Sequence, residues 1–453
     1  MLSDDALVQR LKDLLGQEHV LAGPSASSYA VDGAAPRAVV VPGSVEQVSA
    51  IMALASAEAL KVVPRGSGTK MALGGIPERV DLVLVLSRLS GLVDYEPGDM
   101  TATFRAGTRL KEAQAVLGRH GQFIALDPAY ADLATLGGIL ATNSSGPRRL
   151  RYGASRDLLI ASRVVHADGK VTKGGAKVVK NVAGYDVNKL YIGSLGTLGI
   201  IVEATFRLHP VPPVEKTCLA PLDSIDVAKA VVARILDSPL VPSAVELLNP
   251  EAARRVAEHA GLPWPPDRYG LAVAIGSVRS EAVDAQLEAV RRLCRETDIP
   301  EAHVLDGSVH HDFWRATQDF ALGDGRRVVL KASVLLSQVA EAVKRGEEVA
   351  TQHGLVLGVV SEAASGIIRY HLAARDAASP EHFEPGVAEA VTRLRAFTQE
   401  VEGNLIILEA PPEIKRRVDV WGLLGTAGPL MQRPKAEFDP QRLLNPGRFV
   451  GGI

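Results

Sequence analysis

Three glycine-rich segments between residues 65 and 201 have the residue types that hold a phosphate or a planar ring. The first, Arg65–Thr69 (Arg-Gly-Ser-Gly-Thr), follows an apolar run. Glycines at such a place let the backbone approach a ligand closely and turn its N–H groups inward, which suits a diphosphate. The segment lacks the Gly-Lys-Ser/Thr ending of a Walker loop and the Gly-x-Gly-x-x-Gly fingerprint that opens a helix. Taken alone, it is more typical of a tight turn.

The other two segments extend this pattern. Asp127–Asp157 is crowded with small residues and hydroxyls, and Gly137 and Gly138 stand at a predicted helix start, where free N–H groups would face an anion. Gly193–Ile201 enters a predicted strand, whose backbone edge could pair with a planar ring. Turn chemistry explains each segment separately, but three of them in one domain favour a single long cofactor.

Histidine offers two candidate sites of proton transfer or metal binding. His310 and His311 look like a pair, but neighbours on a strand point to opposite faces, so we expect a loop or cap role instead. His371 follows Tyr370 on a predicted strand and is a weak candidate for a general base. The alternative is a histidine satisfied in the core or at the surface.

Composition excludes several classes of protein. Among 453 residues, 50 Lys and Arg balance 52 Asp and Glu, and aromatic residues make up 4%. Nucleic-acid binding needs a basic surface or stacking rings, which this balance does not provide. Cys218 and Cys294 are the two cysteines, too few for a disulfide framework, a zinc site or an iron–sulfur cluster.

No segment reads as membrane-spanning or as a signal peptide. No apolar run reaches the roughly 18 residues that cross a bilayer. Residues 1–16 predict an acidic amphipathic helix, whereas a signal peptide has a basic start and an apolar centre. We therefore expect a soluble protein in the cytoplasm.

The elements that carry the glycine segments alternate between short strands and helices up to about residue 213. A helix is expected after the capping residue Ser44, and another from Thr108. The strands are expected at 38–41, 61–63, 82–86, 101–105 and 200–208, with a hairpin over 159–172. The prolines at 210, 212 and 213 indicate a domain boundary.

From residue 214 to 427, the predicted strands alternate with longer helices. Strands are expected at 245–248, 271–275, 328–336, 355–360, 367–372 and 405–408. Longer helices are expected at 225–236, 281–295, 337–353 and 385–401. This order predicts an antiparallel sheet covered by helices on one face.

The sequence contains motifs that resemble a known superfamily. They are Pro-Arg-Gly-x-Gly-Thr at 64–69, Leu-Gly-Gly…Asn-Ser-Ser-Gly…Arg-Tyr-Gly…Arg-Asp at 136–157, and Gly-Thr-Leu-Gly-Ile-Ile at 196–201. Together they resemble the FAD-binding domain of the vanillyl-alcohol oxidase/p-cresol methylhydroxylase superfamily. The stretch 174–186, with Lys-Asn-Val-Ala-Gly-Tyr-Asp, and the ending 438–453 are similar, more narrowly, to FAD-binding second subunits of bacterial glycolate oxidases.

The resemblance implies an α+β fold: a two-lobed FAD-binding domain and an antiparallel-sheet cap with helices on one face. The implied divisions are an N-terminal helical segment at 1–35, the FAD-binding domain at 36–213, the cap at 214–427, and a tail at 428–453 that packs back on the FAD-binding domain. The implied FAD contacts are Arg65, Gly66, Ser67, Gly68, Thr69, Pro128, Thr135, Gly137, Gly138, Ser145, Gly146, Tyr152, Gly153, Ile201, Asn445 and Arg448. No His or Cys lies in the 65–69 loop or among the 135–153 contacts, so we expect non-covalent FAD.

The cap departs from relatives that oxidise 2-hydroxy acids with a metal. Those relatives carry a His-x-Gly-Asp-Gly-Asn-x-His motif followed by Gly-Glu-His-Gly, whereas this chain has Glu362-Ala-Ala-Ser-Gly-Ile-Ile-Arg369 and no Gly-Glu-His-Gly. Both His positions of the metal motif are therefore missing, and Arg369 can only donate hydrogen bonds, so we expect no bound metal. Arg315 and Lys331 stand where those relatives bind a carboxylate. Solvated or ion-paired surface charge is the more ordinary role for both.

The resemblance implies an FAD-dependent oxidoreductase acting on CH–OH groups. We expect the FAD-binding subunit of a glycolate or lactate (2-hydroxy-acid) dehydrogenase complex, with a metal-motif flavoprotein and an iron–sulfur subunit as partners. Peripheral attachment at the inner membrane would then occur through those partners. Two alternatives stay open: a stand-alone FAD-linked oxidase or dehydrogenase, and a non-catalytic scaffold subunit.

Overall fold

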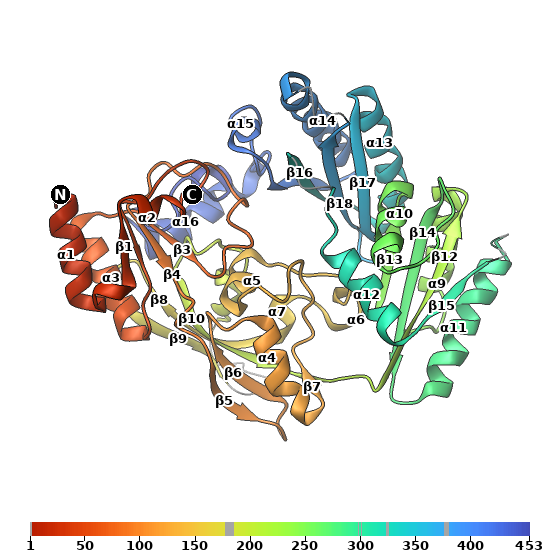
Figure 1. The fold of residues 1–453 in the computed structure, drawn as a ribbon, viewed down its shortest axis with the longest axis horizontal. Coiled ribbons are helices and arrows are strands. Elements are labelled where there is room, and N and C mark those ends of the chain that lie inside the picture. Colours follow the sequence, from red (N-terminus) through yellow and green to blue (C-terminus); the bar gives the residue numbers. More distant parts are fainter. Residues whose placement is uncertain (1, 177–184, 298, 300, 323–325, 376–379) are drawn as a thin grey trace. The chain divides into compact units, whose positions relative to one another are not determined.

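The computed structural model describes residues 2–176, 185–297, 299, 301–322, 326–375 and 380–453. The chain divides into two compact units (Figure 1). Unit 1 comprises Met1–Ser145, Ala154–Val211 and Leu423–Ile453, and unit 2 comprises Gly146–Gly153 and Pro212–Gly422. Residues 178–184, part of the Lys-Asn-Val-Ala-Gly-Tyr-Asp motif, lie outside the described residues.

The first sheet of unit 1 is mainly parallel. Its order is β1 (Val20–Ala22), β2 (Ala38–Val40), β4 (Leu82–Val85) and β3 (Val62–Arg65), with β1 antiparallel to β2. Helices α1 (Asp4–Leu15) and α3 (Val45–Glu58) share a hydrophobic core with it. Ser44 caps α3 as predicted, since its side chain accepts from the Gln47 N–H.

The second sheet of unit 1 is antiparallel. Its order is β5 (Leu92–Glu96), β6 (Thr101–Arg105), β10 (Ile200–Arg207), β8 (Leu159–Val165) and β9 (Val171–Gly175). The predicted hairpin is confirmed by the β8–β9 pairing, and β5 was not predicted. Helix α5 (Leu136–Thr142) packs on β10. The shorter elements of this unit are α2 (Pro24–Ser27), α4 (Leu110–Leu117), β7 (Gln122–Phe123), α7 (Ser155–Leu158), α8 (Asn188–Tyr191) and β11 (His209–Pro210).

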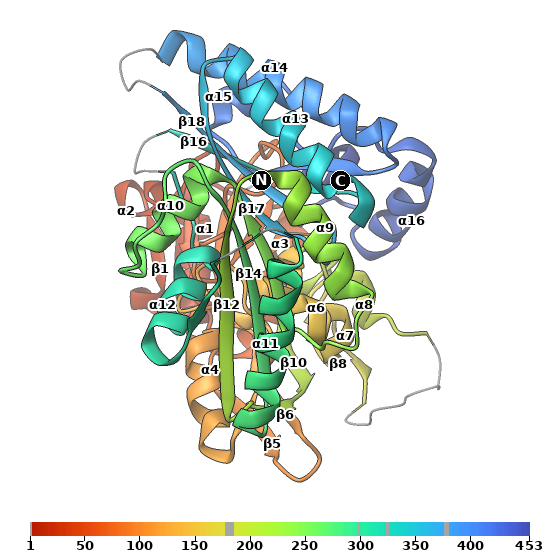
Figure 2. The same cartoon turned by 90° about the vertical axis from the view of Figure 1, so that its right-hand side faces the viewer.

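Unit 2 is built on one eight-stranded antiparallel sheet. Its order is β15 (His303–Leu305), β12 (Val214–Leu222), β14 (Tyr269–Ser277), β13 (Ala244–Leu248), β17 (Leu355–Glu362), β18 (Ile367–Ala374), β16 (Arg327–Ser333) and β19 (Asn404–Glu409). Four helices share the main hydrophobic core with one face: α9 (Ile225–Leu236), α11 (Ser280–Arg295), α13 (Val339–Gln352) and α14 (Pro380–Glu400) (Figure 2). These are the four helices that the sequence predicts.

Two helices on the other face of this sheet were missed. Strand residues alternate in their packing: Val245 and Leu247 belong to the core of the four helices, whereas Ala244 and Leu248 pack with α10 (Pro250–His259) and α12 (Gly307–Gln318). Helices therefore lie on both faces, not on one as expected. The expected loop at residues 310 and 311 is also wrong, because both lie inside α12.

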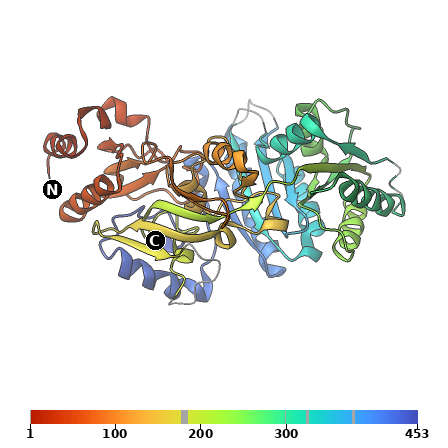
Figure 3. The same cartoon turned by 90° about the horizontal axis from the view of Figure 1, so that it is seen from below.

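The C-terminal segment belongs to unit 1. Helix α16 (Gly428–Phe438), which was not predicted, leads into a stretch that extends the first sheet beyond β3. The Val62 N–H donates to the Leu443 carbonyl and the Asn445 N–H donates to the Val62 carbonyl, at 2.7 and 2.9 Å. Phe438 stacks on His166, directly after β8, with ring centroids 5.5 Å apart. Figure 3 shows the end of the chain, in dark blue, beside the yellow strands of unit 1. Residues more than 380 positions apart in the sequence thus pair at one edge of the sheet.

None of the helices in the described part of the chain is both long and apolar enough to cross a membrane.

Candidate functional site

A cavity in unit 1 brings together the loop after β3, the start of α5 and the C-terminal segment. About 590 Å³ inside it is free of protein atoms, part of this open to solvent. It is lined by Pro64, Gly66, Ser67, Gly68, Thr69, Lys70, Met71, Leu73, Pro128, Ala134, Thr135, Gly138, Ile139, Ala141, Thr142, Ser144, Leu195, Asn445 and Arg448.

Close backbone packing explains the glycines of the loop after β3. A Cβ atom at Gly66 would overlap the hydroxyl of Thr135, the N-cap of α5. Gly68 has φ = +90°, a conformation that side chains disfavour. The loop therefore approaches α5 more closely than any other residue type would allow.

The backbone N–H groups at the start of α5 differ from the expectation, because they have partners within the protein. The Gly137 N–H donates to the Ala106 carbonyl at 2.8 Å, and the Gly138 N–H donates to the Thr135 hydroxyl at 3.3 Å. These two N–H groups are therefore occupied, not free for an anion as predicted. Gly138 instead gives the cavity room, since an added Cβ would meet only the Thr135 hydroxyl, at 3.0 Å.

The positive charge at the cavity comes from Lys70 and Arg448. Lys70 was missed by sequence reasoning; its Nζ lies 5.1 Å from the Tyr130 ring centroid. Arg65, the cation that was predicted, does not line the cavity, and its guanidinium lies over the Tyr29 ring at 4.9 Å. A lysine at the end of a glycine loop was the signal that could have found Lys70.

Arg448 is held rigidly in the cavity wall. It is 3% exposed and donates from Nη2 to the carbonyls of Met71 and Leu73 at 2.6 and 2.5 Å. Burial lowers the pKa of Arg448 to about 10, so the side chain stays charged at neutral pH. Gly74 and Gly75 pack directly against the backbone of Arg448 and Gly447.

The remaining predicted contacts do not line this cavity. Gly137, Ser145 and Ile201 belong to unit 1 but are absent from its lining. Gly146, Tyr152 and Gly153 belong to unit 2, where α6 (Arg149–Tyr152) lies.

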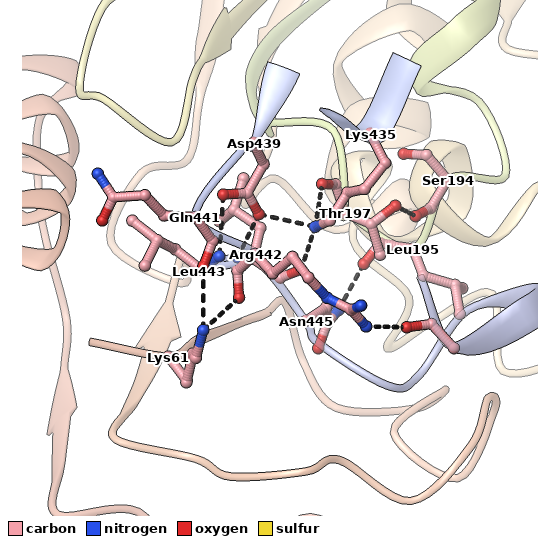
Figure 4. A network of polar contacts seen from close by, with 12 residues as sticks. Lys61, Ser194, Leu195, Thr197, Lys435, Asp439, Gln441, Arg442, Leu443 and Asn445 are labelled. Atoms are coloured by element: carbon pink, nitrogen blue, oxygen red, sulfur yellow. Dashed lines mark hydrogen bonds and ion pairs between the residues drawn. The ribbon is translucent and has the colours of Figure 1, made fainter. Parts of the chain in front are cut away.

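A buried polar network secures the C-terminal segment beside the cavity (Figure 4). The Lys435 ammonium donates to the Thr197 carbonyl, the Asp439 carboxylate and the Leu444 carbonyl at 2.9, 2.7 and 3.0 Å. Asp439 accepts from the N–H groups of Leu443 and Leu444. Burial lowers the pKa of Lys435, and the neighbouring Asp439 opposes that shift.

In unit 2, three of the weak catalytic candidates share one sheet face. Lys331 and Arg369 are directly paired across β16 and β18, and His371 follows on the same face of β18. Arg369 forms an ion pair with the buried Glu362 carboxylate. Burial, followed by the positive charges of Arg369 and Arg149, lowers the pKa of Lys331. His371 is buried, with the Phe320 ring edge-on at 4.8 Å.

The two histidine neighbours and Arg315 lie on α12. His310 is buried and shares the Thr217 hydroxyl with the Trp314 indole N–H, at 2.9 and 2.7 Å. Its Nε2 lies 3.7 Å from the Glu215 carboxylate. Burial alone would raise the pKa of Glu215, but hydrogen bonds and nearby charges, first from His310, lower it to about 2. His310 is thus a structural partner, while Arg315 is exposed.

No group of three or more His, Cys, Asp or Glu residues that could hold a metal ion occurs in the described ranges of the chain.

Comparison with known proteins identifies the family. Residues 36–175 match the FAD binding domain, and residues 211–405 match the C-terminal domain of FAD linked oxidases. D-2-hydroxyglutarate dehydrogenase of Xanthomonas citri pv. viticola is 30% identical over 426 residues, which cover 91% of this chain and 89% of that protein. The chain belongs to the FAD-linked oxidase family.

Two further proteins are similar to this chain. Glycolate oxidase subunit GlcD of Bacillus subtilis is 28% identical over 427 residues, covering 91% of this chain and 89% of that subunit. The structure of p-cresol methylhydroxylase with substrate bound superposes with a TM-score of 0.75 at 17% identity, over 98% of this chain and 96% of that one. This likeness confirms the predicted p-cresol methylhydroxylase-type fold.

The residues of the cavity fit the FAD that this family of oxidoreductases uses. Gly66 lets the loop pack directly against Thr135 at the start of α5, and Gly138 leaves room in the cavity beside it. Lys70 and Arg448 supply cations for a diphosphate. Met71, Leu73 and Ile139 supply apolar walls for a ring system.

Proposed function

We propose that this FAD-linked oxidoreductase is the FAD-binding subunit of a 2-hydroxy-acid dehydrogenase complex acting on glycolate or lactate. The cavity of unit 1 carries the proposal, because it joins a glycine cradle, two cations and apolar walls in one place. The names of the relatives, a D-2-hydroxyglutarate dehydrogenase and a glycolate oxidase subunit, support the 2-hydroxy-acid class.

Within the cavity, we assign the diphosphate to the loop Gly66–Thr69 together with Lys70. The rest of the dinucleotide would contact Pro128, Thr135, Gly138, Asn445 and Arg448. The proposal keeps Arg65, Gly137, Ser145, Gly146, Tyr152, Gly153 and Ile201 as contacts outside this lining. No His, Cys or Tyr stands among the described residues that line the cavity, which supports non-covalent attachment.

The substrate's carboxylate is assigned to unit 2. When bound, FAD supplies a hydride acceptor for the carbon that bears the hydroxyl group. Lys331 and Arg369 lie side by side on one sheet face; Glu362 pairs with Arg369, and an anion bound there would balance the charge of Lys331. His371 on the same face remains the candidate base, and Arg315 a further carboxylate-binding candidate.

In this assignment the electrons pass to an iron–sulfur cluster on another protein, because the two cysteines of this sequence cannot ligate a four-cysteine cluster. An iron–sulfur subunit and a metal-motif flavoprotein are the proposed partners, in the cytoplasm or held at the inner membrane by the complex. Purification of the tagged chain from its own cells tests this assignment. We expect both partners to co-purify; recovery of neither would contradict it.

The substrate class is tested on the FAD-loaded complex without oxygen. Addition of glycolate, D-lactate or D-2-hydroxyglutarate should bleach the flavin absorbance, whereas an unrelated primary alcohol should not. A yellow complex that none of the three hydroxy acids bleaches would contradict the assigned class. A chain that takes up no FAD would contradict the assigned cavity.

A further inference from the structure

The C-terminal segment shapes the cavity wall through two residues in a backbone conformation that is unusual outside glycine. Leu195 and Asn445 have φ values of +53° and +49°, and both line the cavity. Side chains disfavour this region, so surrounding contacts must hold both residues in place. The two are joined to each other, since the Asn445 side-chain amide donates to the Leu195 carbonyl.

Local contacts hold the turn at 194–197 on one side only. The Leu195 N–H donates to the Ala141 carbonyl at the end of α5, at 2.8 Å. Within the turn, the Thr197 hydroxyl donates to the Ser194 carbonyl at 2.7 Å. These bonds tie the turn to α5, but they do not reach the C-terminal segment that forms the facing wall.

Lys435 adds a second connection between the turn and the C-terminal segment, beside the Asn445–Leu195 bond. Its ammonium donates to the Thr197 carbonyl in the turn and to the Leu444 carbonyl, which directly precedes Asn445 (Figure 4). The side chain is 6% exposed, and the Asp439 carboxylate, fully buried, balances its charge. One buried cation therefore bridges the carbonyls of Thr197 and Leu444, which are 247 residues apart in the sequence. Thr197 lies two residues after Leu195 and Leu444 directly precedes Asn445, so the bridge stands next to the Asn445–Leu195 bond.

We propose that Lys435 is a positioning residue of the flavin site. Its bridge holds the 194–197 turn against residues 443–448, so that the cavity wall forms only when the C-terminal segment is docked. Flavin binding and docking of this segment are then coupled, and each stabilises the other. This inference rests on the proposed flavin cavity and is independent of the substrate.

Lys61 provides a matched control. Its ammonium also donates to two carbonyls of the C-terminal segment, those of Gln441 and Arg442, at 3.0 and 2.8 Å. It does not contact the 194–197 turn and does not line the cavity. Lys61→Met therefore removes two hydrogen bonds to the segment without breaking the bridge.

Flavin affinity of three variants tests the bridge. We expect Lys435→Met to weaken FAD binding at least about tenfold, measured from quenching of flavin fluorescence, and Lys61→Met to change it less than about twofold. Because Lys435→Met leaves Asp439 buried and unpaired, Lys435→Met/Asp439→Asn removes both charges and should weaken FAD binding equally. A folded Lys435 variant with wild-type FAD affinity would overturn the proposal.

Hydrogen exchange on the unaltered protein gives a second, variant-free test. FAD should slow exchange of the N–H groups of Leu195, Leu444 and Asn445, while the N–H groups of β14 in unit 2 serve as reference. If the wild type binds FAD and exchange at these three positions is unchanged, the coupling is refuted even where the variants fail to fold. If the wild type binds no FAD, the assigned cavity fails instead.

Discussion

At the scale of single residues, Lys70 and Arg65 are alternative cations for the same diphosphate. They stand five positions apart on one loop, but only Lys70 lines the cavity. We expect Lys70→Met to weaken FAD binding by about tenfold, or about 1.4 kcal/mol, as for a lost hydrogen bond to a charged group. Arg65→Met is the matched control and should have a smaller effect, with flavin fluorescence as the readout. If Arg65→Met weakened FAD binding more than Lys70→Met, Arg65 would be the cation that binds the diphosphate, as first predicted.

A substitution at Gly138 tests whether FAD binding needs the empty space beside this residue. A valine there would project into the cavity, since a Cβ meets only the Thr135 hydroxyl. We expect Gly138→Val to lose FAD by about 100-fold or more in affinity, equivalent to about 3 kcal/mol of overpacking. Gly118→Val, where nothing lies within 4 Å of the added Cβ, should retain the flavin. A yellow Gly138→Val protein with one FAD per chain would contradict the assigned cavity.

The lowered pKa of Lys331 predicts how substrate binding depends on pH. Burial and the charges of Arg369 and Arg149 lower its pKa in the free protein, and a bound carboxylate would raise it. Substrate binding should therefore take up a proton and weaken as the pH rises through the pKa of the free lysine. We expect Lys331→Met to raise KM by about tenfold and to remove this pH dependence, since the ammonium is gone.

The control for Lys331 is Lys344→Met, which removes an exposed ammonium of the same unit that pairs with Asp226. It should leave both KM and its pH profile unchanged. The same profile in wild type and Lys331→Met would show that the carboxylate binds elsewhere.

At the scale of elements, the sequence predicted the helices whose bounds depend on residues close by in the chain. The spacing of apolar residues located α9 at 225–236, and the Ser44 cap located the start of α3, because both depend on residues within one or two turns. Helix α12 was missed because two of its four buried positions, His310 and Thr317, are polar, and because it is stabilised by packing against the distant strand β12. Lys435 was missed because its partner Thr197 lies 238 residues away.

The link between α6 and β12 gives an element-scale prediction. Arg148, at the start of α6, pairs with Glu215 at 2.8 Å, and this contact helps to lower the pKa of Glu215 to about 2. A carboxyl group with a lowered pKa stabilises the folded state above its unfolded value near 4.5, and this contribution disappears as the pH falls towards 2. The shift corresponds to about 3 kcal/mol.

We therefore expect Glu215→Gln to lower the unfolding free energy of unit 2 at pH 7, with the difference from wild type shrinking below pH 4.5. Urea unfolding at a series of pH values measures this. Asp284→Asn, which removes an exposed carboxylate of the same unit, should have little effect. A Glu215→Gln difference that is constant from pH 7 to pH 3 would contradict the assigned titration.

At the scale of the whole molecule, the two compact units should respond to different perturbations. The assigned cavity lies entirely in unit 1, whereas Glu215 and its partners belong to unit 2. A ligand that binds only the folded state stabilises it by about 2.7 kcal/mol at 100 times its Kd. FAD at that excess should therefore slow global hydrogen exchange of β10 in unit 1 by about 100-fold.

Glu215→Gln gives the reciprocal result, because it should speed exchange of β14 in unit 2 and leave the effect of FAD on β10 intact. Comparing both strands with and without FAD, in wild type and variant, separates the two units in one experiment. If FAD protects β14 as strongly as β10, contacts from Gly146, Tyr152 or Gly153 must carry flavin binding energy into unit 2. If FAD protects β14 alone, the cavity of unit 1 is not the flavin site, since binding energy must appear where the ligand is held.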